Sequence, residues 1–190
     1  MKNILTGIGV MLFVGFAGIL LVAKVEKNRT IPPAIATTRA PLPDSREQKI
    51  AAAMWDVAKV FGRDSGCKDA SPDLGRLVAE AAIDEQVDPK LVAAVVSVES
   101  KCNPFATSSR GAIGLMQIMP GIWKGSYDFE NKINLLNEKD NIRTGTHILA
   151  GYIKSYGNQD GIVHYQGTGA GCLTCDDQYA SKVIKLADGK

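Results

Sequence analysis

The feature that most constrains this chain is an uncharged, apolar run near its amino terminus, from Ile4 to Ala23. As a helix, this run is about long enough to cross a hydrocarbon layer of roughly 30 Å. The alternative is a cleaved signal peptide, but the run exceeds a typical h-region and no convincing small-x-small cleavage site precedes Lys24. Residues 1–23 are therefore predicted to be an uncleaved membrane anchor. Basic residues flank the run on both sides, so the positive-inside rule leaves its orientation open.

The segment after the anchor, residues 24–44, is polar and rich in proline, and it lacks helical periodicity. This composition is typical of an extended linker. Of the 190 residues, the remaining stretch 45–190 has room for one compact domain. The net charge of +2, without a stripe of Lys and Arg, argues against a nucleic-acid partner.

Helical patterns succeed one another through residues 45–190, and no stretch keeps the alternation of a half-buried strand. We therefore predict a mainly α-helical domain. Cap and first-turn residues mark where its helices begin. These starts are a capping box of Ser45 and Gln48, then Ser71-Pro72, Asp88-Pro89 and Asn137, and a last helix after Asp176 with Tyr179 facing inward.

Four cysteines lie in the predicted domain, at Cys67, Cys102, Cys172 and Cys175. An even number of cysteines behind a membrane-targeting segment favours disulfides, with three possible full pairings. Cys172 and Cys175 have the spacing of half a zinc site or of a redox motif. The other two cysteines do not form a second such pair, so the sequence favours disulfides and no metal.

One acidic residue, Glu99, has an unusual position on the helix predicted after Asp88. It lies four residues after Val95 and three after Val96, so it leaves the helix from the apolar face. The helix dipole in the last turn and the apolar neighbours both disfavour its ionised form, so its pKa is expected to be raised. A carboxylic acid of this kind is what glycoside cleavage needs. The alternative is a structural Glu that pairs with Lys101 or Arg110, or that caps a neighbouring turn.

A second polar residue, Gln117, stands alone in the apolar run from Gly114 to Pro120. A buried amide must find partners for both its donor and its acceptor. The N-acetyl group of a sugar supplies a matching pair. The alternative is that Gln117 bonds the backbone of its own loop.

These segments resemble the lytic transglycosylase family. The resemblance rests on Val98-Glu99-Ser100, on Gly114-Leu115-Met116-Gln117 and on Pro120, and it covers roughly residues 73–185. A third family motif, Ala-Tyr-Asn-Ala-Gly, is only partly matched by His164-Tyr165-Gln166-Gly167. The resemblance implies a helical domain like that of goose-type lysozyme.

The resemblance also implies a role for each matching residue. Glu99 is expected to be the single catalytic residue, first the general acid and then the base. The expected substrate-binding residues are Ser108 near the muramyl sugar, Gln117 on its acetamide, Tyr165 beside the acid, and Gly114, Leu115 and Met116 in the groove floor. Gln166 is also expected to bind the substrate, but it replaces the asparagine of the third family motif, so its contacts are expected to differ.

The implied reaction needs no metal or cofactor, and no second carboxylate is evident. The carboxylates of Asp128, Glu130, Glu138, Asp140 and Asp160 all have solvated, loop or capping interpretations. In the family, the acetamide of the substrate takes the second role and a 1,6-anhydromuramyl product forms. The alternatives are a hydrolytic muramidase and a catalytically silent peptidoglycan-binding scaffold.

The expected partner is the glycan strand of peptidoglycan. With the predicted anchor, this places the protein in the bacterial inner membrane as a single-pass protein, with its domain in the periplasm or otherwise outside the membrane. A phage-encoded chain would instead belong to the virion. Cell-wall remodelling, a trans-envelope machine and phage entry all fit these expectations.

Overall fold

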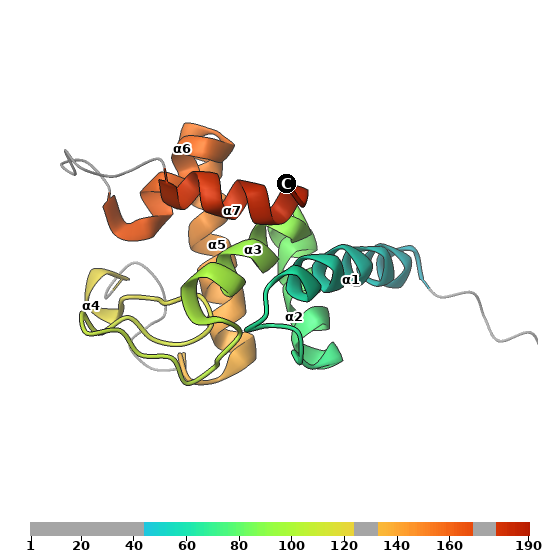
Figure 1. Cartoon of the computed structure of the whole chain (residues 1–190), viewed down its shortest axis with the longest axis horizontal. Helices are drawn as coiled ribbons and strands as arrows, with labels where there is room; N and C mark the ends of the chain where they lie inside the picture. The colour runs from blue at the N-terminus through green and yellow to red at the C-terminus, as the bar shows by residue number, and fades with distance from the viewer. Residues whose placement is uncertain (1–43, 124–132, 169–177) are drawn as a thin grey trace, which may run out of the picture. The chain divides into compact units, whose positions relative to one another are not determined.

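The computed structural model describes residues 44–123, 133–168 and 178–190, which belong to one compact unit (Figure 1). Within these ranges the only extended pairings are isolated bridges, from Ile113 to Thr107 and to Ile118. The predicted mainly α-helical class is therefore confirmed. The helices are α1 Ser45–Arg63, α2 Pro72–Glu85, α3 Pro89–Ser100, α4 Pro120–Trp123, α5 Glu138–Tyr156, α6 Asn158–Val163, the π-helical turn η2 His164–Thr168, and α7 Gln178–Asp188.

The predicted anchor, residues 1–23, lies outside the described ranges, as does the linker 24–44 apart from Asp44. Across the ranges that the structure describes, no helix combines the length and the apolar character that crossing a membrane requires.

Local cap chemistry explains where three of the helices begin. The side chain of Ser71 accepts a hydrogen bond from the backbone N–H of Leu74, and Asp88 accepts one from that of Lys90. Asn137 accepts one from the backbone N–H of Asp140. Each bond satisfies a donor that the first helical turn leaves open. The predicted starts of α2, α3 and α5 are confirmed.

The predicted start of α1 is wrong in detail. The N-cap is Asp44, and Ser45 is already the first helical residue. The carbonyl of Asp44 accepts the first helical hydrogen bond from the N–H of Gln48, at 3.0 Å. The hydroxyl of Ser45 bonds the carboxylate of Asp44, at 3.3 Å, so the expected capping box does not form.

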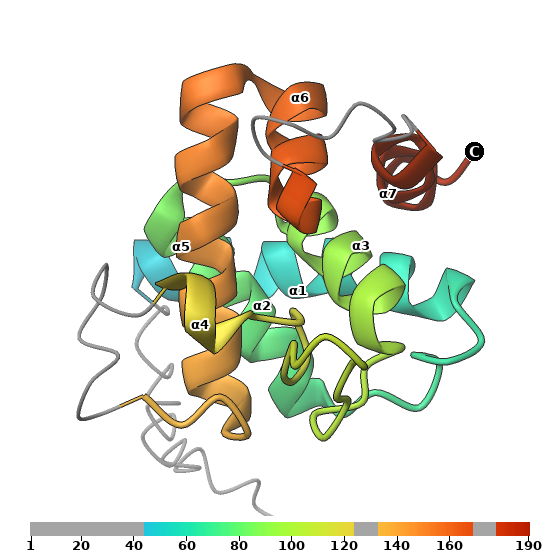
Figure 2. The ribbon, with the colours of Figure 1, turned by 90° about the vertical axis from the view of Figure 1, so that its left-hand side faces the viewer.

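The central element is α3, which is buried along most of its length. Its residues from Leu91 to Ser97 are all buried, and it packs against α1, α2 and α7. Figure 2 shows α5 standing beside α6, with α3 next to them. Because helices surround α3, its carboxyl-terminal turn, which carries Glu99, is held in a fixed place in the domain.

The chain directly after α5 is also helical, which the sequence analysis did not predict. Gly157 separates α5 from α6, and η2 follows α6 directly. Gly161 allows the two helices to approach closely, because a Cβ at this position would lie 2.7 Å from the backbone of Ile153. This close contact brings η2, with the predicted residues Tyr165 and Gln166, alongside the rest of the domain.

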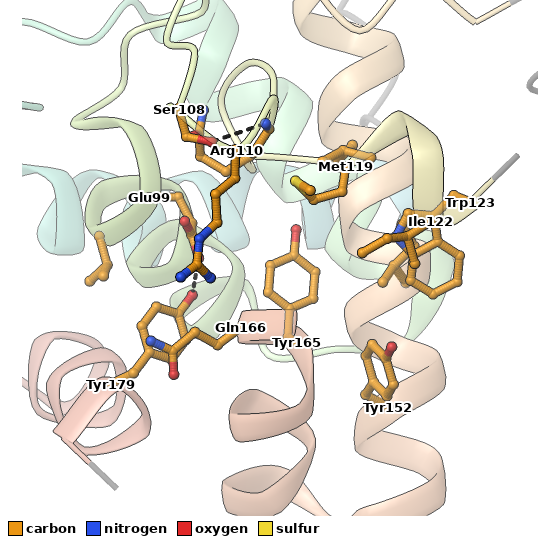
Figure 3. Close-up of a pocket in the computed structure, with 15 residues that line it drawn as sticks. Glu99, Ser108, Arg110, Met119, Ile122, Trp123, Tyr152, Tyr165, Gln166 and Tyr179 are labelled. Carbon is orange, nitrogen blue, oxygen red and sulfur yellow. Dashed lines mark hydrogen bonds between the residues drawn. The ribbon is translucent and has the colours of Figure 1, made fainter. Parts of the chain in front are cut away.

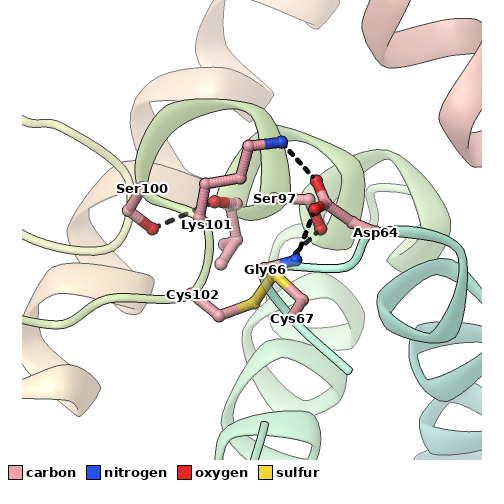
Figure 4. The surroundings of a disulfide bond; sticks show 8 residues. Asp64, Gly66, Cys67, Ser97, Ser100, Lys101 and Cys102 are labelled. Atoms are coloured by element: carbon pink, nitrogen blue, oxygen red, sulfur yellow. Dashed lines mark hydrogen bonds and ion pairs between the residues drawn. A yellow bond between two sulfur atoms is a disulfide. The ribbon is translucent and has the colours of Figure 1, made fainter. Parts of the chain in front are cut away.

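A disulfide joins Cys67, after α1, to Cys102, just beyond α3 (Figure 4). Beside it, the buried carboxylate of Asp64 pairs with Lys101 at 2.7 Å and accepts the backbone N–H of Gly66 at 2.9 Å. Of the three pairings that the sequence left open, the structure supports the one that contains Cys67–Cys102. Cys172 and Cys175 lie outside the described residues.

Candidate active site

A groove of about 650 Å³ opens beside the last turn of α3. Glu99 lies in this groove together with residues from the loop after α3 and from α4, α5, η2 and α7 (Figure 3). Its lining residues are Val98, Glu99, Ser108, Arg110, Ala112, Gln117, Ile118, Met119, Ile122, Trp123, Ile148, Tyr152, Tyr165, Gln166 and Tyr179. The volume and the mixture of apolar and polar side chains are typical of a small-molecule or oligosaccharide site.

Glu99 is partly buried, and its carboxylate is bonded by the hydroxyl of Tyr179 from α7, with 2.5 Å between the oxygens. Burial raises the pKa of Glu99, while the hydrogen bond from Tyr179 and the positive charge of Lys182 act in the opposite direction. Burial is the largest of these effects, so the pKa of Glu99 is raised overall. This is the direction that the sequence predicted.

The structural alternative for Glu99 was an ion pair with Lys101 or Arg110. Lys101 instead pairs with Asp64. Among the ion pairs of the described residues, none includes Glu99. The carboxylate is therefore bonded by a neutral phenol and stays accessible from the groove.

The loop between α3 and α4 forms one wall of the groove. It leaves α3 through Lys101 and Cys102, both with positive φ values of 55° and 60°. It then makes a tight turn in which Ala112 donates its backbone N–H to the hydroxyl of Ser108 and accepts the N–H of Ser108 through its carbonyl, each at 3.0 Å. These bonds place Ser108 in the groove lining.

The Gly114–Gln117 segment is held from below by Asn141 of α5. The buried amide of Asn141 accepts the N–H of Met116 at 2.8 Å and donates to the carbonyls of Ile113 and Leu135. Gly114 is required here, because its φ is +79° and a Cβ would lie 2.1 Å from the Asn141 nitrogen. Asn141 therefore fixes the backbone that carries Gln117.

The predicted floor residues Gly114, Leu115 and Met116 do not line the groove. Leu115 and Met116 are completely buried, and Met116 packs onto Gly145 of α5. Instead, the three residues support the lining from beneath. The groove surface nearest to them is formed by the residues that follow, Gln117, Ile118 and Met119.

Gln117 lines the groove with a positive φ of 48°. Its side-chain nitrogen donates to the carbonyls of Ala106 and Gly114, at 3.1 and 2.9 Å. The amide nitrogen thus bonds its own loop, as the alternative interpretation of Gln117 expected. With the nitrogen fixed in this way, the carbonyl oxygen is the end of the side chain that a ligand would meet.

Tyr165 lines the groove from η2, and its hydroxyl donates to the carbonyl of Met116 at 2.8 Å. Burial and the nearby charge of Glu99 hold the pKa of Tyr165 well above its ordinary value. It therefore stays a neutral phenol that ties η2 to the Gln117 loop. Gln166, next along the chain, is exposed in the groove lining.

An aromatic wall lies at the other end of the groove. Trp123 of α4 and Tyr152 of α5 meet edge to face, with 6.2 Å between their ring centroids. Tyr152 also stacks on His164. A wall of this kind suits the apolar face of a sugar ring.

Two residues with clear roles at the groove were not identified from the sequence. Tyr179 was expected only as an inward-facing core residue, although a buried hydroxyl needs a partner and so signals a polar contact. Asn141 is buried in a helix, where an amide likewise demands partners. The hydrogen-bond partners of Tyr179 and Asn141 are distant in sequence, so the local sequence pattern does not identify these partners.

Among the described residues that line the groove, Glu99 is the only acid. Asp140 belongs to the start of α5, where its carboxylate accepts the N–H of Asn134. Asp128 and Glu130 lie outside the described residues. No group of three potential metal ligands occurs within the described ranges.

Comparison with known proteins gives a consistent result. Residues 76–179 match the family model described as transglycosylase SLT domain. The chain is 34% identical over 111 residues to a transglycosylase of Enterobacteria phage PRD1, covering 57% of this chain and 40% of that protein. It is 30% identical over 117 residues to the membrane-bound lytic murein transglycosylase C of Sodalis glossinidius, and the match covers 58% of this chain and 32% of that protein. It thus spans well under half the length of these relatives.

Proposed function

This chain belongs to the family of transglycosylase SLT domains, the lytic transglycosylases, and on that premise we propose that it cleaves the glycan strands of peptidoglycan. The bond cleaved is the one between N-acetylmuramic acid and N-acetylglucosamine, and the product carries a 1,6-anhydromuramyl end. The proposal includes the lysozyme-like fold that the family resemblance implies.

The observation that carries the proposal is the state of Glu99. It is the only acid among the described residues of the groove lining, its pKa is raised by burial, and a phenol rather than a cation bonds it. A carboxyl group whose pKa is raised holds its proton to higher pH than an exposed glutamate does, and it can donate that proton to a glycosidic oxygen. Glu99 is therefore proposed to be the general acid.

The proposed reaction has two steps. In the first, Glu99 gives its proton to the glycosidic oxygen, and the bond from that oxygen to C1 of the muramyl sugar breaks. The acetamide oxygen of the same muramyl sugar then bonds to C1. In the second, the carboxylate of Glu99 removes the proton of the 6-hydroxyl, whose oxygen displaces the acetamide from C1. The 1,6-anhydro ring closes, Glu99 regains its proton and no water is consumed.

The described part of the lining holds no second acid, and this scheme needs none, because the acetamide does what a second carboxylate does in other glycosidases. For this step the acetamide must be held in place. The free carbonyl oxygen of Gln117 suits the acetamide N–H, and the hydroxyl of Ser108 lies in the same lining. Trp123 is proposed to stack on a sugar of the strand.

Tyr179 is proposed to help Glu99 change roles. Its hydrogen bond favours the ionised carboxylate, whereas burial favours the protonated one. The balance of the two keeps both states accessible, which a residue acting first as acid and then as base requires.

We also propose that the domain acts outside the cytoplasm, tethered by residues 1–23. The disulfide between Cys67 and Cys102 supports this, because such bonds persist in oxidising compartments. The named relatives include a membrane-bound enzyme and a phage protein. An inner-membrane single-pass protein with a periplasmic domain, or a virion component if the chain is phage-encoded, satisfies both observations. We propose that the protein works with a trans-envelope assembly if it is an inner-membrane protein, and with a virion assembly if it is phage-encoded.

The experiment is product analysis by mass spectrometry after digestion of purified peptidoglycan in ¹⁸O-labelled water. A lytic transglycosylase gives unlabelled products that lack one water at the muramyl end. A hydrolytic muramidase gives reducing ends that carry the label. A folded protein that binds the strands and releases no product would be a silent scaffold.

A further inference from the structure

The charges in the groove are few and are of opposite sign. Of the lining residues that the structure describes, only Glu99 and Arg110 carry a charge. Arg110 is exposed, and Figure 3 shows its side chain extended from the turn that contains Ser108. A cationic side chain at the rim of a groove attracts an anionic part of whatever binds there.

Arg110 has no acidic partner within the described residues. The ion pairs there engage other cations: Lys101 on Asp64, Arg46 on Asp84 and Arg76 on Glu47. The positive charge of Lys182 is the one that lowers the pKa of Glu99. The guanidinium is therefore available to a ligand.

The backbone that carries Arg110 is fixed before a ligand arrives. Beyond the two bonds between Ser108 and Ala112, the N–H of Gly111 donates to the carbonyl of Ser108 at 3.0 Å. Gly111 has a φ of +85°, which glycine adopts without strain. A turn closed by three hydrogen bonds holds the arginine at one point of the rim, so binding orders little more than its side chain.

The group that a free guanidinium selects is a carboxylate or a phosphate, through paired N–H bonds. Resting on the proposed function, we propose that Arg110 forms a carboxylate-binding subsite that makes the enzyme prefer strands bearing muramyl carboxylates. Two carboxylates of peptidoglycan fit this chemistry. One is the lactyl carboxylate of a muramyl residue without a peptide, and the other belongs to the peptide stem. A polymer of N-acetylglucosamine has neither.

The test compares the full-length protein with its Arg110→Gln variant on three substrates: peptide-bearing strands, strands stripped by an amidase, and chitin oligosaccharides. We expect Arg110→Gln to lower kcat/KM by roughly ten- to a hundredfold on the strands that offer the carboxylate, mostly through KM. A loss on stripped strands alone identifies the lactyl carboxylate, and a loss on peptide-bearing strands alone identifies the stem. Cleavage of the chitin oligosaccharides should not change.

Two comparisons keep the result interpretable. Arg110→Lys keeps the positive charge and should retain part of the preference for strands that bear carboxylates. Arg143 lies on α5, outside the groove lining, so Arg143→Gln should behave like the unaltered protein. Binding of the three materials is also measured in the Glu99→Gln background with and without Arg110→Gln, which needs no turnover. If no digestion occurs with any protein, the proposed function fails, and these binding curves still test Arg110. Equal weakening on all three materials, or none, would overturn the subsite.

Discussion

The hydroxyl of Tyr179 donates a hydrogen bond to Oε1 of Glu99 from 80 positions further along the chain. This hydrogen bond and the burial of the carboxyl group have opposite effects on the pKa of Glu99, because burial raises it and the bond lowers it. The proposed mechanism uses both states of Glu99, so this opposition has consequences that kinetics can measure.

Tyr179→Phe removes the donor and so removes one of the effects that lower the pKa of Glu99. The acid form should then persist to higher pH, and the basic limb of the rate–pH profile should move upward. We expect kcat to fall about tenfold, since a hydrogen bond to a charged group stabilises by roughly 1.5–3 kcal/mol. Tyr156→Phe, at an exposed tyrosine of α5, is the matched control. An unchanged basic limb in Tyr179→Phe would show that the bond does not tune Glu99.

Glu99→Gln should stabilise the fold in a pH-dependent way. The raised pKa means that the folded protein holds a proton that the unfolded chain releases, so the folded state loses stability as pH rises through this window. A glutamine has no such penalty. The variant should gain Tm at neutral and higher pH, and the gain should vanish below the ordinary pKa of a glutamate, about 4.3. Calorimetry across pH measures this, and a gain independent of pH would contradict it.

Two glycines of α5 should respond oppositely to alanine. At Gly145 a Cβ would lie 2.5 Å from the Met116 sulfur, whereas at Gly151 it would meet nothing within 4 Å. Gly145→Ala is expected to cost about 1–3 kcal/mol through overpacking and to displace the Gln117 loop. Gly151→Ala is expected to stabilise by roughly 0.5–1 kcal/mol. Urea unfolding measures both, and equal effects would argue against the close packing of Met116.

Reduction of the disulfide should weaken the domain. Cys67 and Cys102 are 35 positions apart, and a loop of this size corresponds to about 4 kcal/mol of stability in the chain-entropy model. Cys67→Ser with Cys102→Ser should therefore unfold at lower urea and lose the part of the response to reductant that comes from this bond. Cys172→Ser with Cys175→Ser, which leaves the Cys67–Cys102 bond intact, is the control. If reductant did not change the unfolding of the parent protein, the bond would contribute nothing.

Elements governed by local chemistry could be predicted from the sequence. The starts of α2, α3 and α5 follow from single cap residues, and the placement of Glu99 follows from helical spacing after Asp88. The first helix shows the limit of this reasoning, because Asp44 and Ser45 are both good caps and the helix uses the earlier one.

Features that depend on distant partners could not be predicted. The helix α6 exists next to α5 because Gly161 fits against the Ile153 backbone, a contact that no local pattern shows. Likewise, the apolar residues Leu115 and Met116 were assigned to the groove floor. In the structure they lie beneath it, because Met116 donates its N–H to Asn141 and packs on Gly145. Of the site residues predicted from the sequence, Glu99, Ser108, Gln117, Tyr165 and Gln166 line the groove, whereas Gly114, Leu115 and Met116 support it.

The central claim is that Glu99 supplies the proton for glycan cleavage, and its most direct test is the rate at which anhydro products are released by the parent protein and by Glu99→Gln. The glutamine keeps the shape of the side chain and the acceptor for Tyr179, but it cannot donate a proton as an acid. The account predicts a loss of roughly a hundredfold or more, typical of a missing general acid, with binding to the strands retained. Release of the same products by Glu99→Gln at the parent rate would contradict it.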